Sequence, residues 1–191
     1  GGKSCIFPFV ANIFYENGLI GASYAEPYAG GAGLALRLLF NEYVDHIYIN
    51  DYDRSIYAFW FAIINRSDEF CQWVTEVDVS LETWNYFKEV QRSEVHEDLF
   101  ELAKSTFFLN RTNISGVIKG GVIGGREQKG KYKIDARFRK EVLIQKIQRI
   151  ARFKNRISLS NLDGLAFIKK LDKKKEEIYD VKSFREKPNF E

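Results

Sequence analysis

Cysteine, proline and methionine are scarce or absent in this sequence of 191 residues, and no long apolar run occurs in it. Its two cysteines, Cys5 and Cys71, are too few for a disulfide framework and have no neighbours at metal-ligand spacing, so we interpret both as reduced core residues. No run approaches the roughly 18 apolar residues of a membrane span, and no signal segment opens the chain. These absences predict a soluble, cytoplasmic protein without a metal, built as one globular domain or as one domain with an inserted lobe.

Methionine is missing altogether, although a usage of about 2 per cent would give a chain of this length about four. The first residue is Gly1. We therefore expect residues of the natural reading frame to be missing from the start, from the interior, or wherever a modified methionine was dropped.

Charge is divided unevenly along the chain. Residues 1–100 hold 6 Lys or Arg against 15 Asp or Glu, whereas residues 101–191 hold 23 against 11, so the net charge of +3 hides an acidic and a basic half. Residues 104–156 alone hold 15 basic and 3 acidic side chains. Such a patch is typical of a surface that binds a nucleic-acid backbone, although a solvated lysine-rich face has the same composition.

Hydrophobic periodicity divides the chain into helical and extended segments. Extended runs at 22–26 and 46–50 flank a glycine cluster and an apolar helical pattern, which is the order of a βαβ unit. The glycine-rich residues 110–130 predict a loop or a twisted hairpin. Helical patterns lie at 6–15, 34–40, 53–65, 67–108, 137–153 and 164–170, and a third extended run lies at 156–160.

The glycine cluster follows the first extended run directly. Glycine allows a backbone to turn sharply off a strand and to approach a ligand closely, and the helix that follows presents free N–H groups. An acid at the end of the second strand, roughly 20 residues further on, is placed to bind ribose hydroxyls. Asp51 lies 21 residues after Gly30. This spacing favours a nucleoside-type cofactor, while the absence of a clean G-x-G-x-x-G points away from enzymes that use NAD.

Four motifs in this order resemble the DNA adenine methylase family: GGKS at 1–4, AEPYAGGAG at 25–33, IND at 49–51 and FLNRTNISG at 108–116. The resemblance extends from Gly1 to about Leu171. It implies a site-specific methyltransferase that moves a methyl group from S-adenosylmethionine to the exocyclic amine of adenine in double-stranded DNA. It also implies a Rossmann-like α/β core, formed by 1–53 and 150–191, with an inserted, mostly helical target-recognition lobe and a Gly-rich hairpin at 54–149.

The resemblance also assigns residues to the cofactor. Lys3 matches a lysine near the cofactor's carboxylate, the 26–33 loop matches the segment around the methionine moiety, and Asp51 matches the acid that binds the ribose. The implied cofactor-binding residues are Lys3, Glu26, Pro27, Tyr28, Ala29, Gly30, Gly31, Gly33, Asn50 and Asp51.

The resemblance places DNA contacts in the basic segment that begins at Asn110. Arginine suits guanine and asparagine suits adenine, but phosphate contacts use the same side chains. For Asn110 and Asn113 the alternative that they cap turns stays open. The implied DNA-binding residues are Asn110, Arg111, Asn113, Lys119, Arg126, Lys129 and Lys131, and a restriction endonuclease of the same system is a possible partner.

The family's catalytic motif, Asp-Pro-Pro-Tyr, does not occur in this sequence, whose three prolines are Pro8, Pro27 and Pro188. In the family its carboxylate and a carbonyl accept hydrogen bonds from the target amine, and its aromatic ring stacks on the flipped base. Asp180 is a weak candidate for that acid. Three explanations stay open: a missing catalytic segment, an inactive remnant that binds cofactor or DNA, and a degenerate site at Asp180.

A different class of protein is suggested by the first residues alone. GKS at 2–4 is the end of a P-loop motif, and a helical pattern follows it. A P-loop NTPase would leave the glycine cluster at 30–33 unexplained, so we keep it as a remote alternative.

Overall fold

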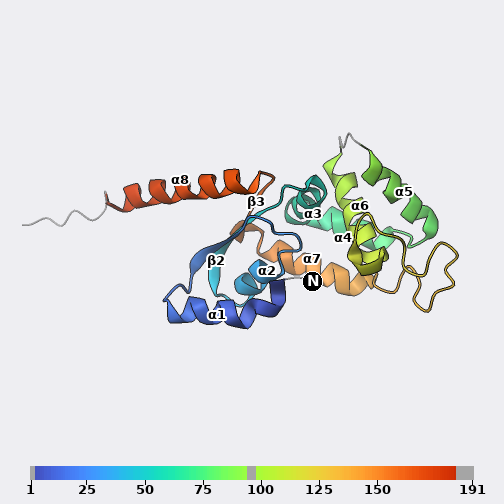
Figure 1. The fold of residues 1–191 in the computed structure, drawn as a ribbon, viewed down its shortest axis with the longest axis horizontal. Coiled ribbons are helices and arrows are strands. Elements are labelled where there is room, and N and C mark those ends of the chain that lie inside the picture. The colour runs from blue at the N-terminus through green and yellow to red at the C-terminus, as the bar shows by residue number, and fades with distance from the viewer. Residues whose placement is uncertain (1–2, 94–97, 184–191) are drawn as a thin grey trace, which may run out of the picture.

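The computed structural model describes residues 3–93 and 98–183 (Figure 1). Its sheet is parallel and three-stranded, in the order β1 (Ala22–Glu26), β2 (Val44–Asn50), β3 (Ile157–Ser160). Glu26 pairs with Ile49, and Asn50 pairs with Ser160. The carboxyl ends of all three strands therefore meet at one edge of the sheet.

Helices make both connections between the strands. Helix α2 (Gly33–Phe40) joins β1 to β2, and in the described part of the chain five α-helices and two 3-10 helices lie between β2 and β3. In Figure 1 α3, α4, α5 and α6 gather at one end of the molecule, and α7 runs from that end back toward the sheet. Helices α1 and α2 lie by the sheet, and α8 projects away from the end of β3. The remaining elements are η1 (Lys3–Ile6), α1 (Phe7–Glu16), α3 (Arg54–Asn65), α4 (Ser67–Glu76), α5 (Leu81–Arg92), α6 (Leu99–Thr112), η2 (Ile114–Gly116), α7 (Lys140–Arg152), η3 (Lys154–Arg156) and α8 (Gly164–Ser183).

The structure confirms the predicted mixture of helices and strands, including the first βαβ unit. Two helical segments differ in extent from the predicted ones. The pattern at 67–108 is divided among α4, α5 and α6, and α8 runs beyond the predicted 164–170. The glycine-rich segment holds one antiparallel bridge, between Asn113 and Val122, and no regular strand is assigned to residues 113–139. The inserted lobe and the hairpin therefore stay predictions, whereas the parallel α/β arrangement is compatible with the predicted class.

One hydrophobic core joins the sheet to the helices. Ile47 and Ile49 of β2 belong to the same buried cluster as Ile63 of α3 and Phe70 of α4. Apolar side chains at helical spacing bury one stripe of each helix, and this burial is the main source of stability. The core thus holds the carboxyl edge of the sheet rigidly against α3.

The interpretation of both cysteines as core residues is wrong for Cys5. Cys5 lies in η1 and is exposed, whereas Cys71 packs half-buried against the core from α4. A 3-10 helix of four residues, next to the end of the described chain, covers too little surface to bury the side chain at every position. Burial and nearby Asp68 raise the pKa of the Cys71 thiol.

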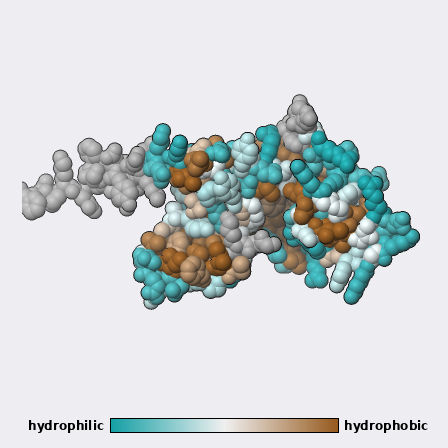
Figure 2. Space-filling view, viewed as in Figure 1, coloured by the Kyte–Doolittle hydropathy of each residue, from teal (hydrophilic) through white to brown (hydrophobic). Residues whose placement is uncertain are grey.

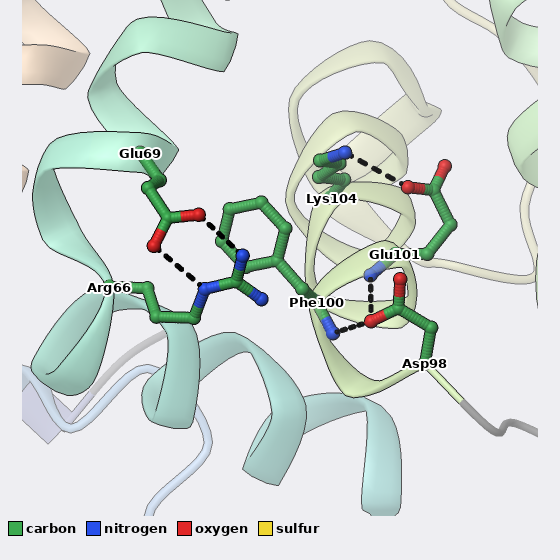
Figure 3. Close-up of polar contacts among 6 residues, drawn as sticks. All are labelled: Arg66, Glu69, Asp98, Phe100, Glu101 and Lys104. Atoms are coloured by element: carbon green, nitrogen blue, oxygen red, sulfur yellow. Dashed lines mark hydrogen bonds and ion pairs between the residues drawn. The ribbon is translucent and has the colours of Figure 1, made fainter.

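Asp98 caps the first turn of α6, the helix at the centre of the helical end (Figure 3). Its Oδ1 accepts hydrogen bonds from the backbone N–H groups of Phe100, at 2.8 Å, and Glu101, at 3.3 Å. The Arg66 guanidinium, which pairs with Glu69, lies 3.9 Å from the centre of the Phe100 ring. The first turn of α6 is therefore held by an N-cap and by a cation–π contact.

Replacing Asp98 with alanine should lower the free energy of unfolding by about 1 kcal/mol, because two N–H groups lose their acceptor. Urea denaturation measures this change. Asp98→Asn keeps an acceptor oxygen and serves as the control. If the alanine and asparagine variants unfold at the same urea concentration, the cap does not stabilise α6.

Candidate functional site

The carboxyl edge of the parallel sheet gathers the residues on which the sequence analysis concentrated. Ligands of open α/β sheets bind outside this edge. Residues 27–32 leave β1 as a tight loop in which Gly30 has a φ of +51° and Ala32 a φ of 45°. A positive φ strains most residues with a side chain, so it favours glycine at the first of these positions.

Asp51 is fixed against this loop. Its Oδ2 accepts a hydrogen bond from the backbone N–H of Gly30 at 2.8 Å, and its Oδ1 accepts one from the N–H of Asp53 at 3.0 Å. Its side chain is half-buried. A carboxylate has about four lone-pair sites, so Asp51 can still accept hydrogen bonds from a ligand.

Glu26 ends β1 and is 2% exposed. Its Oε1 accepts a hydrogen bond from the N–H of Ala35, at 3.2 Å, in the first turn of α2. A carboxylate at a helix N-terminus is stabilised by the free N–H groups there. Burial, and then the charge of Glu26, raise the pKa of Tyr24 to about 12. Glu26 therefore acts first by holding the start of α2 at the loop.

Asn50 is completely buried at the end of β2. Its Nδ2 donates to the carbonyls of Pro27 and Leu162, and its Oδ1 accepts from the N–H of Leu162, each at 2.9 Å. One amide thus ties the ends of all three strands together. This geometry makes Asn50 a positioning residue of the edge.

Trp60 supports the loop from the helical side. Its Nε1 donates to the carbonyl oxygen of Gly30 at 2.7 Å, from the middle of α3. Gly30 is therefore held on one side by Asp51 and on the other by Trp60. The sequence predicts only a helix over 53–65, and the periodicity of that helix carries no signal for this bond.

Two glycines allow close packing around the loop. A Cβ at Gly33 would overlap the hydroxyl of Ser4, and one at Gly164 would overlap the Tyr28 ring. The GKS segment and the 30–33 loop therefore belong to one place in the fold. Ala29 is buried, while Gly31 and Tyr28 are exposed, Tyr28 to 64%.

Two assigned residues have side chains outside the described part of the structure. Lys3 begins η1, beside the loop. Asp180 belongs to α8, a helix, rather than to the end of a strand.

The segment after β3 was missed by sequence reasoning, although it lies at the same edge. The Nδ2 of Asn161 donates to the backbone carbonyls of Asp51, at 2.7 Å, and Tyr52, at 3.0 Å. Tyr52 and Leu165 expose 72% and 68% of their surface there. The sequence could have indicated this segment, because the carboxyl ends of parallel strands meet at one edge, so the residues after the third extended run belong to the same edge.

A cavity of about 300 Å³ lies between the glycine loop (residues 27–32) and the helical end of the molecule. Gly30 and Gly31 line one side, and Phe107, Asn110 and Arg111 of α6 line another. Burial and the charge of nearby Arg137 lower the pKa of Arg111. The cavity therefore joins the glycine loop to the segment in which DNA contacts were predicted.

The two asparagines of that segment organise its backbone. Asn113 is fully buried, and its Nδ2 donates to the carbonyls of Val117, at 2.8 Å, and Ile118, at 2.9 Å, while Oδ1 accepts from Trp84. The Nδ2 of Asn110 donates to the carbonyl of Gly116 at 2.9 Å. These contacts support the turn-capping alternative, most strongly for Asn113, whose side chain is not accessible to DNA in this structure.

Four of the five predicted basic contacts are exposed, in contrast to the two asparagines and to half-buried Arg111. Lys119, Arg126, Lys129 and Lys131 all lie on the surface of the 113–139 loop. Lys129 forms an exposed ion pair with Glu127 at 2.6 Å. Figure 2 shows hydrophilic residues over this outer end of the molecule. Of the seven predicted DNA-binding residues, these four cations are therefore accessible to a DNA backbone.

Within residues 3–93 and 98–183, no group of three or more His, Cys, Asp or Glu is arranged to hold a metal ion. No helix in the part of the chain that the structure describes is both long and apolar enough to cross a membrane.

An open parallel sheet with a glycine loop and a fixed acid at its carboxyl edge defines an α/β class of binding site that is compatible with a methyltransferase. A family model, D12 class N6 adenine-specific DNA methyltransferase, matches residues 1–180. The chain belongs to this family of DNA adenine methyltransferases. No curated protein matches the chain at a significant level.

Proposed function

We propose that S-adenosylmethionine binds at the carboxyl edge of β1, β2 and β3, with the Asp51 carboxylate accepting hydrogen bonds from its ribose hydroxyls. The observation that supports this most is the position of Asp51, which the Gly30 and Asp53 N–H groups hold at the mouth of the loop. Because Gly31 has open space where a Cβ would stand, a ligand can approach that backbone closely. The proposed contacts are those of Lys3, Tyr28, Gly30, Gly31 and Asp51.

Other predicted cofactor residues have supporting roles in this proposal. Glu26 holds the start of α2, and Asn50 holds the three strand ends, so both shape the site from beneath. Pro27, Ala29 and Gly33 supply the course of the loop. Exposed Tyr52 and Leu165 add apolar surface at the same edge, which suits the flat face of an adenine ring.

The reaction we propose is methyl transfer to N6 of adenine in double-stranded DNA. When bound, the cofactor would supply a methyl group already activated on a sulfonium; its transfer would leave a neutral thioether, and the methylated amine would release one proton to solvent. The residues of this chain bind and orient the two reactants, which is where most of the rate of such a transfer can originate. The four exposed cations of the 113–139 loop hold the DNA backbone.

A second candidate function is a protein that binds cofactor and DNA without methyl transfer. The observation that favours it is the absence of Asp-Pro-Pro-Tyr from the sequence. Both candidates use the same cofactor edge and the same basic loop, so they differ only in the chemical step.

One pair of measurements on the full chain separates the candidates. Calorimetry measures binding of S-adenosylmethionine, and methyl-labelled cofactor with long DNA free of adenine methylation measures transfer. We expect binding together with labelled N6-methyladenine. Binding without transfer would identify the inactive binder, and the absence of binding would overturn both.

A further inference from the structure

Residues of α5 and of the 113–139 loop line a concave basic surface, which we call the basic groove. Figure 1 shows α5 and this loop at the outer end of the helical part. Two adjoining hollows, of about 430 and 390 Å³, share Lys88, Arg92 and Lys119, and Arg126 and Trp84 line the larger one. The described lining residues of both hollows include no carboxylate. Four cations from two separate elements therefore face one concave surface.

Lys88 differs from the other cations of the groove because its ammonium group is hydrogen-bonded within the protein. Its half-buried Nζ donates to the carbonyls of Ile118 and Gly120, each at 3.3 Å, and lies 5.4 Å from the centre of the Trp84 ring. Burial, and then the charge of Arg92, lower the pKa of Lys88. Lys88 thus clamps the loop to α5.

Trp84 completes this clamp. Its Nε1 donates to Oδ1 of buried Asn113 at 2.6 Å, and the Arg126 guanidinium lies 5.9 Å from its ring. Trp84 and Lys88 are one turn apart on α5, so a single face of that helix fixes the start and the middle of the loop. The walls of the groove are consequently held at a set separation.

The remaining cations are accessible. Lys119, Arg126 and Arg92 are exposed. Arg92 forms an ion pair with Glu89 at 2.5 Å, and more than 60% of both side chains is exposed. Such a surface pair is worth little and can exchange its partner. A phosphate can take the place of the carboxylate, because both groups accept two parallel hydrogen bonds from an arginine.

We propose that this groove binds the sugar-phosphate backbone of double-stranded DNA, with Arg92, Lys119 and Arg126 contacting phosphates and Lys88 acting as a positioning residue. The inference rests on the proposed function. Arg92 and Lys88 belong to residues 1–100, whose net charge is −9, so linear charge patterning gives no sign of them. The fold brings them beside the basic loop.

The salt dependence of DNA binding tests the phosphate contacts. Each lost contact should reduce the slope of log affinity against log salt by about 0.9. We expect this reduction for Arg92→Gln and none for Arg152→Gln, a matched exposed arginine at the sheet end of α7. An unchanged slope in Arg92→Gln would overturn the groove.

Hydrogen exchange tests the role of Lys88. Lys88→Met keeps the stem over Trp84 but removes both bonds to the loop carbonyls, and we expect the amides of residues 114–121 to exchange at least tenfold faster, with rescue by Lys88→Arg. Unchanged exchange in Lys88→Met would overturn the positioning role.

If the unaltered chain binds S-adenosylmethionine but no DNA, the DNA part of the proposed function fails together with the groove. If it binds DNA and only the Arg92 result fails, the groove alone is wrong.

Discussion

Replacing Asp51 with alanine is expected to weaken binding of S-adenosylmethionine by roughly 10- to 100-fold. A hydrogen bond to a charged acceptor contributes about 1.5–3 kcal/mol, and 1.4 kcal/mol corresponds to a factor of ten. The variant loses the proposed acceptor of the ribose hydroxyls, and it also releases the N–H of Gly30, which is bonded to Oδ2 at 2.8 Å. Gly30 would then keep its hydrogen bond from Trp60 but lose the one to Asp51.

Calorimetry on the full chain measures this change, with urea denaturation of the same variant to show that it is folded. Asp53→Ala is the matched control, because it removes the same charge two residues away. Asp53 caps α3 through a bond from the N–H of Ser55, at 2.8 Å, so its loss should cost stability but leave cofactor affinity unchanged. Equal affinity in folded Asp51→Ala and in the unaltered chain would contradict the cofactor site.

The βαβ unit could be predicted from sequence because its signals are local. Residues 22–50 combine an extended run, a glycine turn, an apolar helical pattern and a second extended run, and the structure follows them closely. The spacing from Gly30 predicted an acid at the end of the second strand, and Asp51 does follow β2 directly, where it accepts a hydrogen bond from Gly30. Local pattern and tertiary arrangement agree there, which is why the fold class was accessible.

The remainder of the site depends on contacts between distant segments. Asn113 reads as a DNA contact by its motif, but Trp84 and the carbonyls of Val117 and Ile118 use its side chain. The bond from Trp60 to Gly30 spans 30 residues and leaves no periodic signal. Hydrogen-bond partners of this kind are fixed by packing, so residue type alone cannot reveal them.

Charge along the chain was also an incomplete guide to the surface. The basic half correctly indicated an exposed cationic loop, since Lys119 and Arg126 lie on the surface. Lys88 and Arg92 of the acidic half face the same hollows. The net charge of a sequence segment takes in only residues that are neighbours along the chain. The groove combines side chains from segments that only the fold places side by side.

Asn50→Asp is expected to be the most destabilising single change at the edge of the sheet. Nδ2 of Asn50 donates to the carbonyls of Pro27 and Leu162, each at 2.9 Å, in a completely buried position. A carboxylate oxygen in its place would face two carbonyl oxygens without a proton to share. We expect the free energy of unfolding to fall by about 3 kcal/mol at pH 7, because buried groups lose their partners.

The pH dependence of the stability of Asn50→Asp is a stricter test than the fall in its free energy of unfolding at pH 7 alone. Burial among carbonyls raises the pKa of the new carboxyl above its unfolded value of about 3.9, so the folded state holds a proton that the unfolded state releases. The destabilisation should therefore increase as the pH rises from about 4 to 7. Urea denaturation at several pH values measures it, with Asn155→Asp, an exposed substitution in η3, as the control. If both variants respond to pH in the same way, Asn50 does not tie the strand ends together, and the edge that we propose for the cofactor is held by other contacts.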